Sequence, residues 1–337
     1  MATTGAEDAV LGVLQDPALL LGIPLALAGA LCMSLGAQYQ HSGVEKVERS
    51  VGSGGASGLR WAHLRALATR PSWLAGTLLL VLAVVCQLGA ISVAPLMVVQ
   101  PLGVVALLLT TILNSRASGV PPTKRSWTAL AACIGGIGLF VGIAARYATK
   151  PAVANGDVVI ILLLLLTVVV ALLTAWLLFR QRLPALFYVS AAGLLYGFVA
   201  TLAKILIDRM QEGNVDWFLA LCVVALIGAG ILGGYFVQTA YSSGPPDLVV
   251  AGLTVVDPLV AVVLAMSVLG ESSAAPTWTF LVFATAGCLA AGGVVALARH
   301  HQSAEQNVKN PREQAPARSG SESPLLTASH EPGATHS

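Results

Sequence analysis

Residues 71–115 read PSWLAGTLLLVLAVVCQLGAISVAPLMVVQPLGVVALLLTTILNS, a stretch of 45 residues without a single Asp, Glu, Lys or Arg. A helix needs about 20 predominantly apolar residues to cross a bilayer, so this stretch is long enough for two crossings. The pattern continues on both sides. Charge-free stretches also cover 17–44, 126–145, 158–179, 183–203, 217–246 and 272–298. The sequence therefore predicts a polytopic membrane protein.

The composition excludes several other classes of protein. Of the 337 residues, 56% are apolar and 10% are charged, and the mean hydropathy is +0.81. A soluble domain carries about 25% charged residues, so an ordinary soluble enzyme is excluded. The net charge of +2 is too small for a protein that binds nucleic acid electrostatically.

We expect an all-α fold with about nine transmembrane helices. Lipid offers no partner for unpaired backbone groups, and the spacing of about 20 residues does not suit a β-barrel. Turn residues such as Pro121-Pro122 and Asn155-Gly156 separate the apolar segments. The expected spans are 18–40, 73–92, 94–114, 126–146, 157–179, 184–207, 217–240, 247–269 and 276–298.

The basic residues predict the orientation of these spans. With the N-terminus outside, 14 Lys and Arg residues fall in the inner loops and tail and three fall outside, as the positive-inside rule requires. The extracytoplasmic segment 1–17 carries no Lys or Arg and so lacks the basic start of a cleavable signal peptide. We expect a multi-pass protein of the plasma membrane with its C-terminus in the cytoplasm.

Two segments are expected outside the helical bundle. The cytoplasmic loop 41–72 becomes basic and amphipathic at 59–67, which suits either a plain linker or a short helix at the membrane surface. The tail 299–337 is rich in Ser, Pro, Gly, Glu and Gln, a composition typical of disorder.

An internal repeat relates the two halves of the chain. Val98-Val99-Gln100-Pro101-Leu102 recurs as Val255-Val256-Asp257-Pro258-Leu259, and 126–130 (SWTAL, with Trp127) recurs at 277–281 (TWTFL, with Trp278). The repeats cover 18–146 and 184–298, and 147–183 holds a connecting span. Because the matched segments are five places apart in the order of spans, they cross the membrane in opposite directions and the two four-helix repeats are inverted, an arrangement typical of carriers with a substrate site at the repeat interface.

The same residues resemble a known family. The run from Ala94 through Pro95 to Gly103, followed by the fourth span, is similar to the first half of the NIPA-type magnesium transporters, in the drug/metabolite transporter (EamA-like) superfamily. Lys204 and Val255-Asp257-Pro258 resemble the second half. The resemblance covers about 18–298 and implies a nine-span carrier. The chain differs from the family at Val84, where an acidic residue is usual, and at Asp257, where the family has Thr.

Asp257 is the leading candidate for a site residue. A charge at the centre of a membrane helix costs about 2.5–3.5 kcal/mol, so it usually has a functional or pairing reason. Pro258 removes a backbone donor beside it, and we expect Pro258 and its repeat mate Pro101 to break their helices and free carbonyl groups. Asp257 is also the tentative metal ligand. The alternative is an acid that is neutralised by a neighbour, with Lys204 as the simplest partner.

The remaining candidates are polar residues inside spans. Lys204 either lines a cavity or extends its amine to the headgroups, and Thr201 shares its helix face. Gln100 is the repeat mate of Asp257. Glu271 is interpreted as a solvated helix end. The other candidates for the pathway are Gln38, Gln87 and Gln238, for which hydrogen bonds between helices are the alternative role.

These patterns predict a secondary transporter that moves a small solute or cation by alternating access, with Mg²⁺ among the candidate substrates. The alternatives are a translocator of a lipid or lipid-linked metabolite and a non-transporting membrane scaffold. We expect no enzymatic activity, no cofactor and no nucleic-acid partner. The expected partners are the lipid bilayer and the transported solute, and a homodimer is left open.

Overall fold

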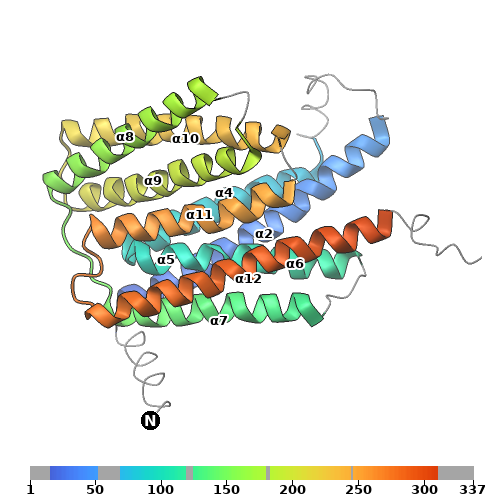
Figure 1. Ribbon diagram of the computed structural model, residues 1–337, viewed down its shortest axis with the longest axis horizontal. Coiled ribbons are helices and arrows are strands. Elements are labelled where there is room, and N and C mark those ends of the chain that lie inside the picture. Colours follow the sequence, from blue (N-terminus) through green and yellow to red (C-terminus); the bar gives the residue numbers. More distant parts are fainter. Residues whose placement is uncertain (1–15, 52–68, 119–123, 180–182, 244–245, 310–337) are drawn as a thin grey trace, which may run out of the picture.

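The computed structural model describes residues 16–51, 69–118, 124–179, 183–243 and 246–309 (Figure 1). This part of the chain is helical and contains no strand. The helices are α2 (Pro17–Val51), α4 (Pro71–Val93), α5 (Leu96–Gly103), α6 (Val105–Ser118), α7 (Lys124–Tyr147), α8 (Asn155–Phe179), α9 (Ala185–Gln211), α10 (Trp217–Ser243), α11 (Pro246–Ser267) and α12 (Thr277–Lys309).

The protein is an all-α polytopic membrane protein. Eight of the described helices are long and apolar enough to cross a membrane, and the apolar segment Leu96–Thr110 of α5 and α6 is a shorter candidate. Counting α5 and α6 as one interrupted span, the described helices form nine spans, as the sequence predicts.

Proline begins several of these helices. Pro71 is in the first turn of α4, Pro17 and Pro246 begin α2 and α11, and Pro184 precedes α9. Proline suits these positions because the first helical N–H groups have no partner inside the helix and its fixed φ angle is already helical. Proline therefore marks the start of these four helices in the sequence.

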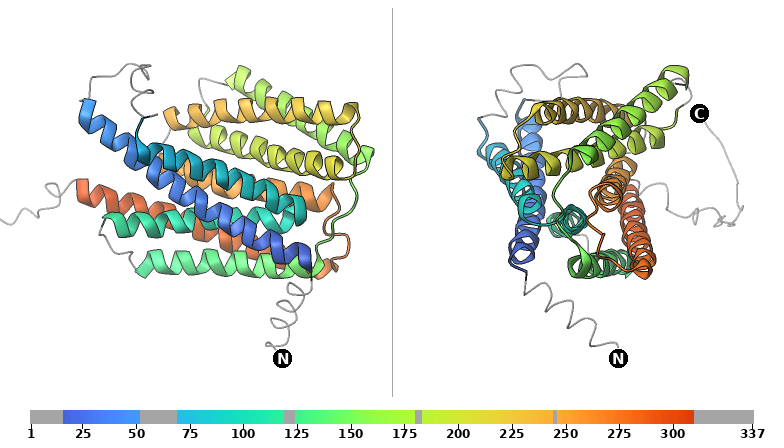
Figure 2. Two further views of the ribbon diagram at one scale, coloured as in Figure 1. Left: turned by 180° about the vertical axis from the view of Figure 1, so that it is seen from behind. Right: turned by 90° about the vertical axis from the view of Figure 1, so that its left-hand side faces the viewer.

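The packing of the helices repeats between the two halves. In the first half α2 packs along α4, and in the second α9 packs along α10. Across the halves, α5 packs against α11, and α7 packs along α12. These are the pairs of matched repeat segments. Because α5 begins where α11 ends, the two repeats run in opposite directions through the bundle, and α8 connects them at the edge, against α9 and α10 (Figure 2).

The ends of the helices form two opposite faces of the bundle. One face carries the turn between α4 and α5 (residues 94–95) and the loops α7–α8, α9–α10 and α11–α12; we call it the junction end (left in Figure 1). The distribution of basic residues predicts this end to be extracytoplasmic. The C-terminal ends of α2 and α12 lie at the opposite end.

Two helices are longer than the sequence predicts. α2 continues to Val51, into the expected cytoplasmic loop, and α12 continues to Lys309, into the expected disordered tail. Helical hydrogen bonding does not require apolar residues, so a helix can continue beyond the charge-free segment from which its span was predicted. The expected surface helix at 59–67, residues 1–15 and the tail from 310 lie outside the described residues.

Candidate functional site

A cavity of about 320 Å³ lies where the two repeats meet. Pro101 and Val104 line it at the α5–α6 turn and Phe140 lines it from α7, whereas Pro258 of α11 and Phe283 of α12 come from the second repeat. The two prolines of the matched motifs therefore face one space. The Phe140 and Phe283 rings pack 4.8 Å apart, centre to centre, across the boundary between the repeats.

Gly136 and Gly287 occupy the same position relative to Trp127 and Trp278 in the matched fourth and ninth spans, but they have different roles at this boundary. A Cβ atom at Gly136 would lie 2.7 Å or less from backbone atoms of Ala286 and Ala290, so this glycine lets α7 approach α12 closely. Its repeat mate Gly287 lines the cavity, and a Cβ atom there would meet nothing within 4 Å. The cavity thus has unfilled space on the side of α12.

Asp257 lies on a different side of α11 from the cavity. The residues of α11 that line the cavity include Thr254, Pro258 and Val262, one helical turn apart. Asp257 belongs to the side that packs on α9, where Gly193 allows close approach to Val256 and to the Asp257 backbone. Its Oδ1 atom is buried and has no hydrogen-bond partner among the described residues.

The two matched prolines affect their helices differently. α5 ends at Gly103, two residues after Pro101, and α6 begins at Val105, so this span is interrupted as expected. The expected break at Pro258 is wrong, because α11 continues through it from Pro246 to Ser267. α9 packs closely along this segment, with Gly197 against Val260, and membrane helices tolerate proline where neighbouring helices support them.

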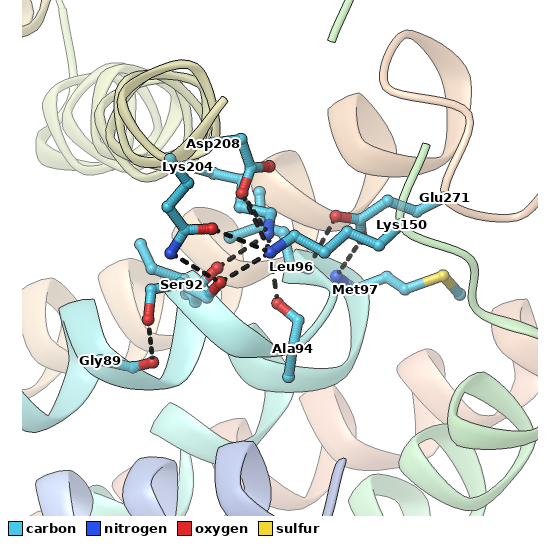
Figure 3. Close-up of polar contacts among 11 residues, drawn as sticks. Gly89, Ser92, Ala94, Leu96, Met97, Lys150, Lys204, Asp208 and Glu271 are labelled. Carbon is cyan, nitrogen blue, oxygen red and sulfur yellow. Dashed lines mark hydrogen bonds and ion pairs between the residues drawn. The ribbon is translucent and has the colours of Figure 1, made fainter. Parts of the chain in front are cut away.

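Lys204 is fully buried at the junction end, with 1% of its surface exposed, so its amine does not extend to the headgroups. Its Nζ atom donates to the carbonyl oxygens of Ile91 (2.8 Å) and Ala94 (3.4 Å) and pairs with Asp208 Oδ1 at 3.1 Å (Figure 3). The expected pairing of Lys204 with Asp257 is therefore wrong. Asp208 lies one turn further along α9, and side chains four residues apart on a helix are neighbours.

A second lysine joins this cluster from the α7–α8 loop. Lys150 Nζ lies 3.3 Å from Asp208 Oδ1 and donates to the Ser92 carbonyl oxygen at 2.7 Å. Together the two lysines contact carbonyl groups of residues 91–94, at the C-terminal end of α4. Cations are favourable there because the partial negative charge of a helix lies at its C-terminus.

Glu271 occupies the other side of the same turn and is buried, with 2% of its surface exposed. Its Oε1 and Oε2 atoms accept hydrogen bonds from the backbone amides of Leu96 (2.8 Å) and Met97 (2.7 Å), in the first turn of α5. These amides have no partner within the helix, and a carboxylate stabilises that end of the helix dipole. The interpretation of Glu271 as a solvated helix end is therefore wrong.

The turn that precedes Glu271 directs its side chain toward α5. Gly270 has a φ of 67°, a left-handed conformation that favours glycine and turns the chain back at the end of α11. The Glu271 amide then donates to the Ala265 carbonyl at 3.0 Å, and its own carbonyl accepts from the Thr149 amide at 2.8 Å. Glu271 thereby joins the second repeat to α5 of the first.

The other predicted pathway residues are not gathered at one place. Thr201 is buried, but its hydroxyl donates to the Gly197 carbonyl of its own helix. Gln100 is buried in α5 beside Pro101, and Gln38 and Gln87 are half-buried on α2 and α4. Gln238 is exposed on α10. The sequence pattern does not distinguish a polar residue that is buried between helices, such as Gln100, from one that is exposed, such as Gln238.

Comparisons with known proteins add one relative. An uncharacterized protein of Corynebacterium glutamicum is 28% identical over 283 residues, which cover 83% of this chain and 95% of the relative. No family model matches the chain, and no solved structure matches it. The similarity extends over most of both chains and so is not confined to one motif.

Proposed function

We propose that this protein is a secondary carrier of the drug/metabolite transporter type, and that it moves a small organic solute through the cavity between its two repeats. One observation supports this most directly: the matched prolines Pro101 and Pro258 line a single cavity midway along the bundle. Alternating access needs a site at the repeat interface near the middle of the membrane, and a cavity lined by both repeats supports this mechanism.

The walls of the cavity favour a substrate with an apolar body. Phe140, Phe283 and the aliphatic residues around them offer contact area and few polar groups. A volume of about 320 Å³ is at the lower end of the range of about 300–1,000 Å³ for small-molecule sites. The substrate class that fits is a small amphipathic molecule.

Magnesium is a less favourable substrate for the same cavity. Mg²⁺ keeps most of its waters and binds through one or two carboxylates, which an apolar wall does not provide. Among the described residues there is no group of three or more His, Cys, Asp or Glu side chains that could hold a metal ion. Asp257 is next to the cavity-lining Pro258, but it lies on the α9 side of its helix.

A second candidate function is translocation of a lipid or lipid-linked metabolite. Leu259 of α11 and Cys288 of α12 line the cavity and are also exposed, Leu259 over 55% of its surface. The cavity therefore opens between these two helices, midway along them, where a membrane protein faces acyl chains. A lateral opening of this kind gives a lipid a route that does not pass through water.

Reconstituted protein tests these functions against one another. Proteoliposomes would be assayed for uptake of tryptophan and ethidium, for transfer of a short-chain fluorescent phospholipid between leaflets, and for uptake of Mg²⁺. We expect transport of at least one of the three organic probes and none of Mg²⁺. Transport of Mg²⁺ alone would contradict the proposal, and transfer of the phospholipid alone would select the second candidate.

A cavity-filling variant links transport to the site. Gly287 lines the cavity and a Cβ atom there meets nothing within 4 Å, so we expect Gly287→Leu to fill part of the cavity and to give a folded protein that no longer transports. Gly138→Leu is the matched control, because its Cβ atom also meets nothing within 4 Å and Gly138 is exposed on α7. Equal activity of the two variants would place the pathway elsewhere.

A further inference from the structure

Glu271 is the one described carboxylate that is buried, ties the two repeats together and lies in a loop. Its oxygens accept from two amides of α5, while its backbone belongs to the loop between α11 and α12. If the junction end opens, α5 separates from this loop and the carboxylate gains water. The same carboxyl group is then desolvated in one state of the carrier and hydrated in the other.

From this geometry we propose that Glu271 is the proton-binding site of the carrier, and that a bound proton favours the state in which the junction end is closed. The proposal rests on the proposed carrier function, because it names the coupling ion of the same alternating-access cycle. It differs from the sequence-based expectation, in which Asp257 responds to protons.

The direction of coupling follows from linkage. Burial raises the pKa of Glu271 to about 7, above its ordinary 4.5, although the Met97 and Leu96 amides act to lower it. The closed state therefore binds the proton more tightly than a state with hydrated Glu271. Whichever state binds the proton more tightly is favoured as the pH falls, so acid closes the junction end and alkali favours opening.

The neighbouring charges act on this carboxyl group from two elements. On α9, Lys204 favours the ionised form and Asp208 favours the protonated form. From the α7–α8 loop, Lys150 reaches Asp208. α5 contributes the two backbone amides. Lys204 acts on Glu271 more strongly than Asp208 does, but burial outweighs both and sets the direction of the shift in the Glu271 pKa.

Two adjacent serines provide the test. Ser272 is buried, with 7% of its surface exposed, whereas Ser273 is exposed. In a background in which the five cysteines are replaced by alanine, Ser272→Cys and Ser273→Cys would be labelled with a membrane-impermeant methanethiosulfonate reagent between pH 5.5 and 8.5. The ratio of the two rates removes the pH dependence of thiol reactivity that the two positions share, and the same ratio in Glu271→Gln shows what is independent of Glu271.

We expect the ratio of Ser272→Cys to Ser273→Cys labelling to fall by roughly 30-fold from pH 8.5 to pH 5.5, the change that a pKa near 7 in one state and near 4.5 in the other implies. Glu271→Gln, which carries a neutral side chain of the same size, should give a low ratio at every pH. A flat wild-type ratio, or a pH dependence that persists in Glu271→Gln, would overturn the proposal.

A second measurement tests the same proposal if the cysteine-free protein does not fold. Hydrogen exchange of the amides of 96–99 in the otherwise native chain, corrected for intrinsic rates, should show more protection at pH 5.5 than at pH 8.5, and no difference in Glu271→Gln. Both readouts are independent of any substrate. If the protein shows this pH response but transports none of the probes, the proposed proton site is supported and the proposed carrier function is contradicted.

Discussion

Lys204 and Glu271 bind opposite sides of one turn in the chain. The Lys204 amine contacts the carbonyl groups of Ile91 and Ala94 at the end of α4, and the Glu271 carboxylate contacts the amides of Leu96 and Met97 at the start of α5. Both residues belong to the second half of the chain. The turn between the second and third spans of one repeat is thus held by charges from the other repeat, each matched to the polarity of a helix end.

Replacing Lys204 should destabilise the protein strongly. In Lys204→Met the Ile91 and Ala94 carbonyl groups lose a buried donor and Asp208 loses its closest cation, so we expect a loss of about 3 kcal/mol in the free energy of unfolding. Lys150→Met is the control, because its side chain is 35% exposed and its pair with the same Asp208 should contribute less than about 1 kcal/mol. Denaturant unfolding in detergent measures both, and equal losses would contradict this ranking.

The close approach of α9 to α11 gives a second prediction. A Cβ atom at Gly197 would lie 2.6 Å from the Val260 side chain, so Gly197→Ala should lower the free energy of unfolding by about 1–3 kcal/mol. Gly228→Ala on α10, where a Cβ atom meets nothing within 4 Å, should be neutral or stabilising by about 0.5–1 kcal/mol. Thermal unfolding of the two variants checks this. Adding Val260→Ala to Gly197→Ala should restore part of the loss, because it removes Val260 Cγ1, one of the two closest contacting atoms, and leaves Cβ in place.

The number of spans could be predicted from the sequence, because crossing a bilayer requires a charge-free apolar stretch whatever its neighbours are. The interruption near Pro101 could also be predicted, since proline cannot donate the backbone hydrogen bond. The same argument was wrong for Pro258, where α9 supports a continuous helix. A local rule gives the same answer for both prolines, and tertiary packing decides between them.

The role of Glu271 could not be predicted from local pattern. Its ligands are the amides of Leu96 and Met97, 174 or more residues away, and they carry no side-chain signature. A signal was nevertheless present: Pro95 marks the start of a helix whose first amides need acceptors, and Gly270 marks a turn that redirects the next residue. Neither signal says that the two lie side by side. That pairing depends on the inverted arrangement of the repeats.

Asp257→Asn tests whether Asp257 takes part in transport. Asp257 lies on the side of α11 that packs on α9, away from the cavity, and its Oδ1 atom is buried without a hydrogen-bond partner among the described residues. Asn keeps the size of the side chain and removes an ionisable group from this buried position, so we expect the melting temperature of the variant to stay unchanged or rise and its transport of the organic probes to persist. Loss of transport by a folded variant would return Asp257 to the mechanism, and a variant that unfolds would show that Asp257 stabilises the helix packing.

The pH dependence of stability gives the last prediction. The pKa of Glu271 is about 7 in the folded protein and 4.5 in water, so the folded state binds an additional proton between these values. The stability that this proton contributes is fully present below pH 4.5 and is lost as the pH rises through 7, in total about 3 kcal/mol. Glu271→Gln cannot titrate, so the difference in unfolding free energy between wild type and variant should change in favour of the variant from pH 5 to pH 8. Glu212→Gln on the exposed α9–α10 loop is the control and should leave that difference constant. If wild type gained stability relative to Glu271→Gln as the pH rose, the carboxylate would be better stabilised by the two amides and Lys204 than burial allows, and Glu271 would be a structural cap that stays ionised.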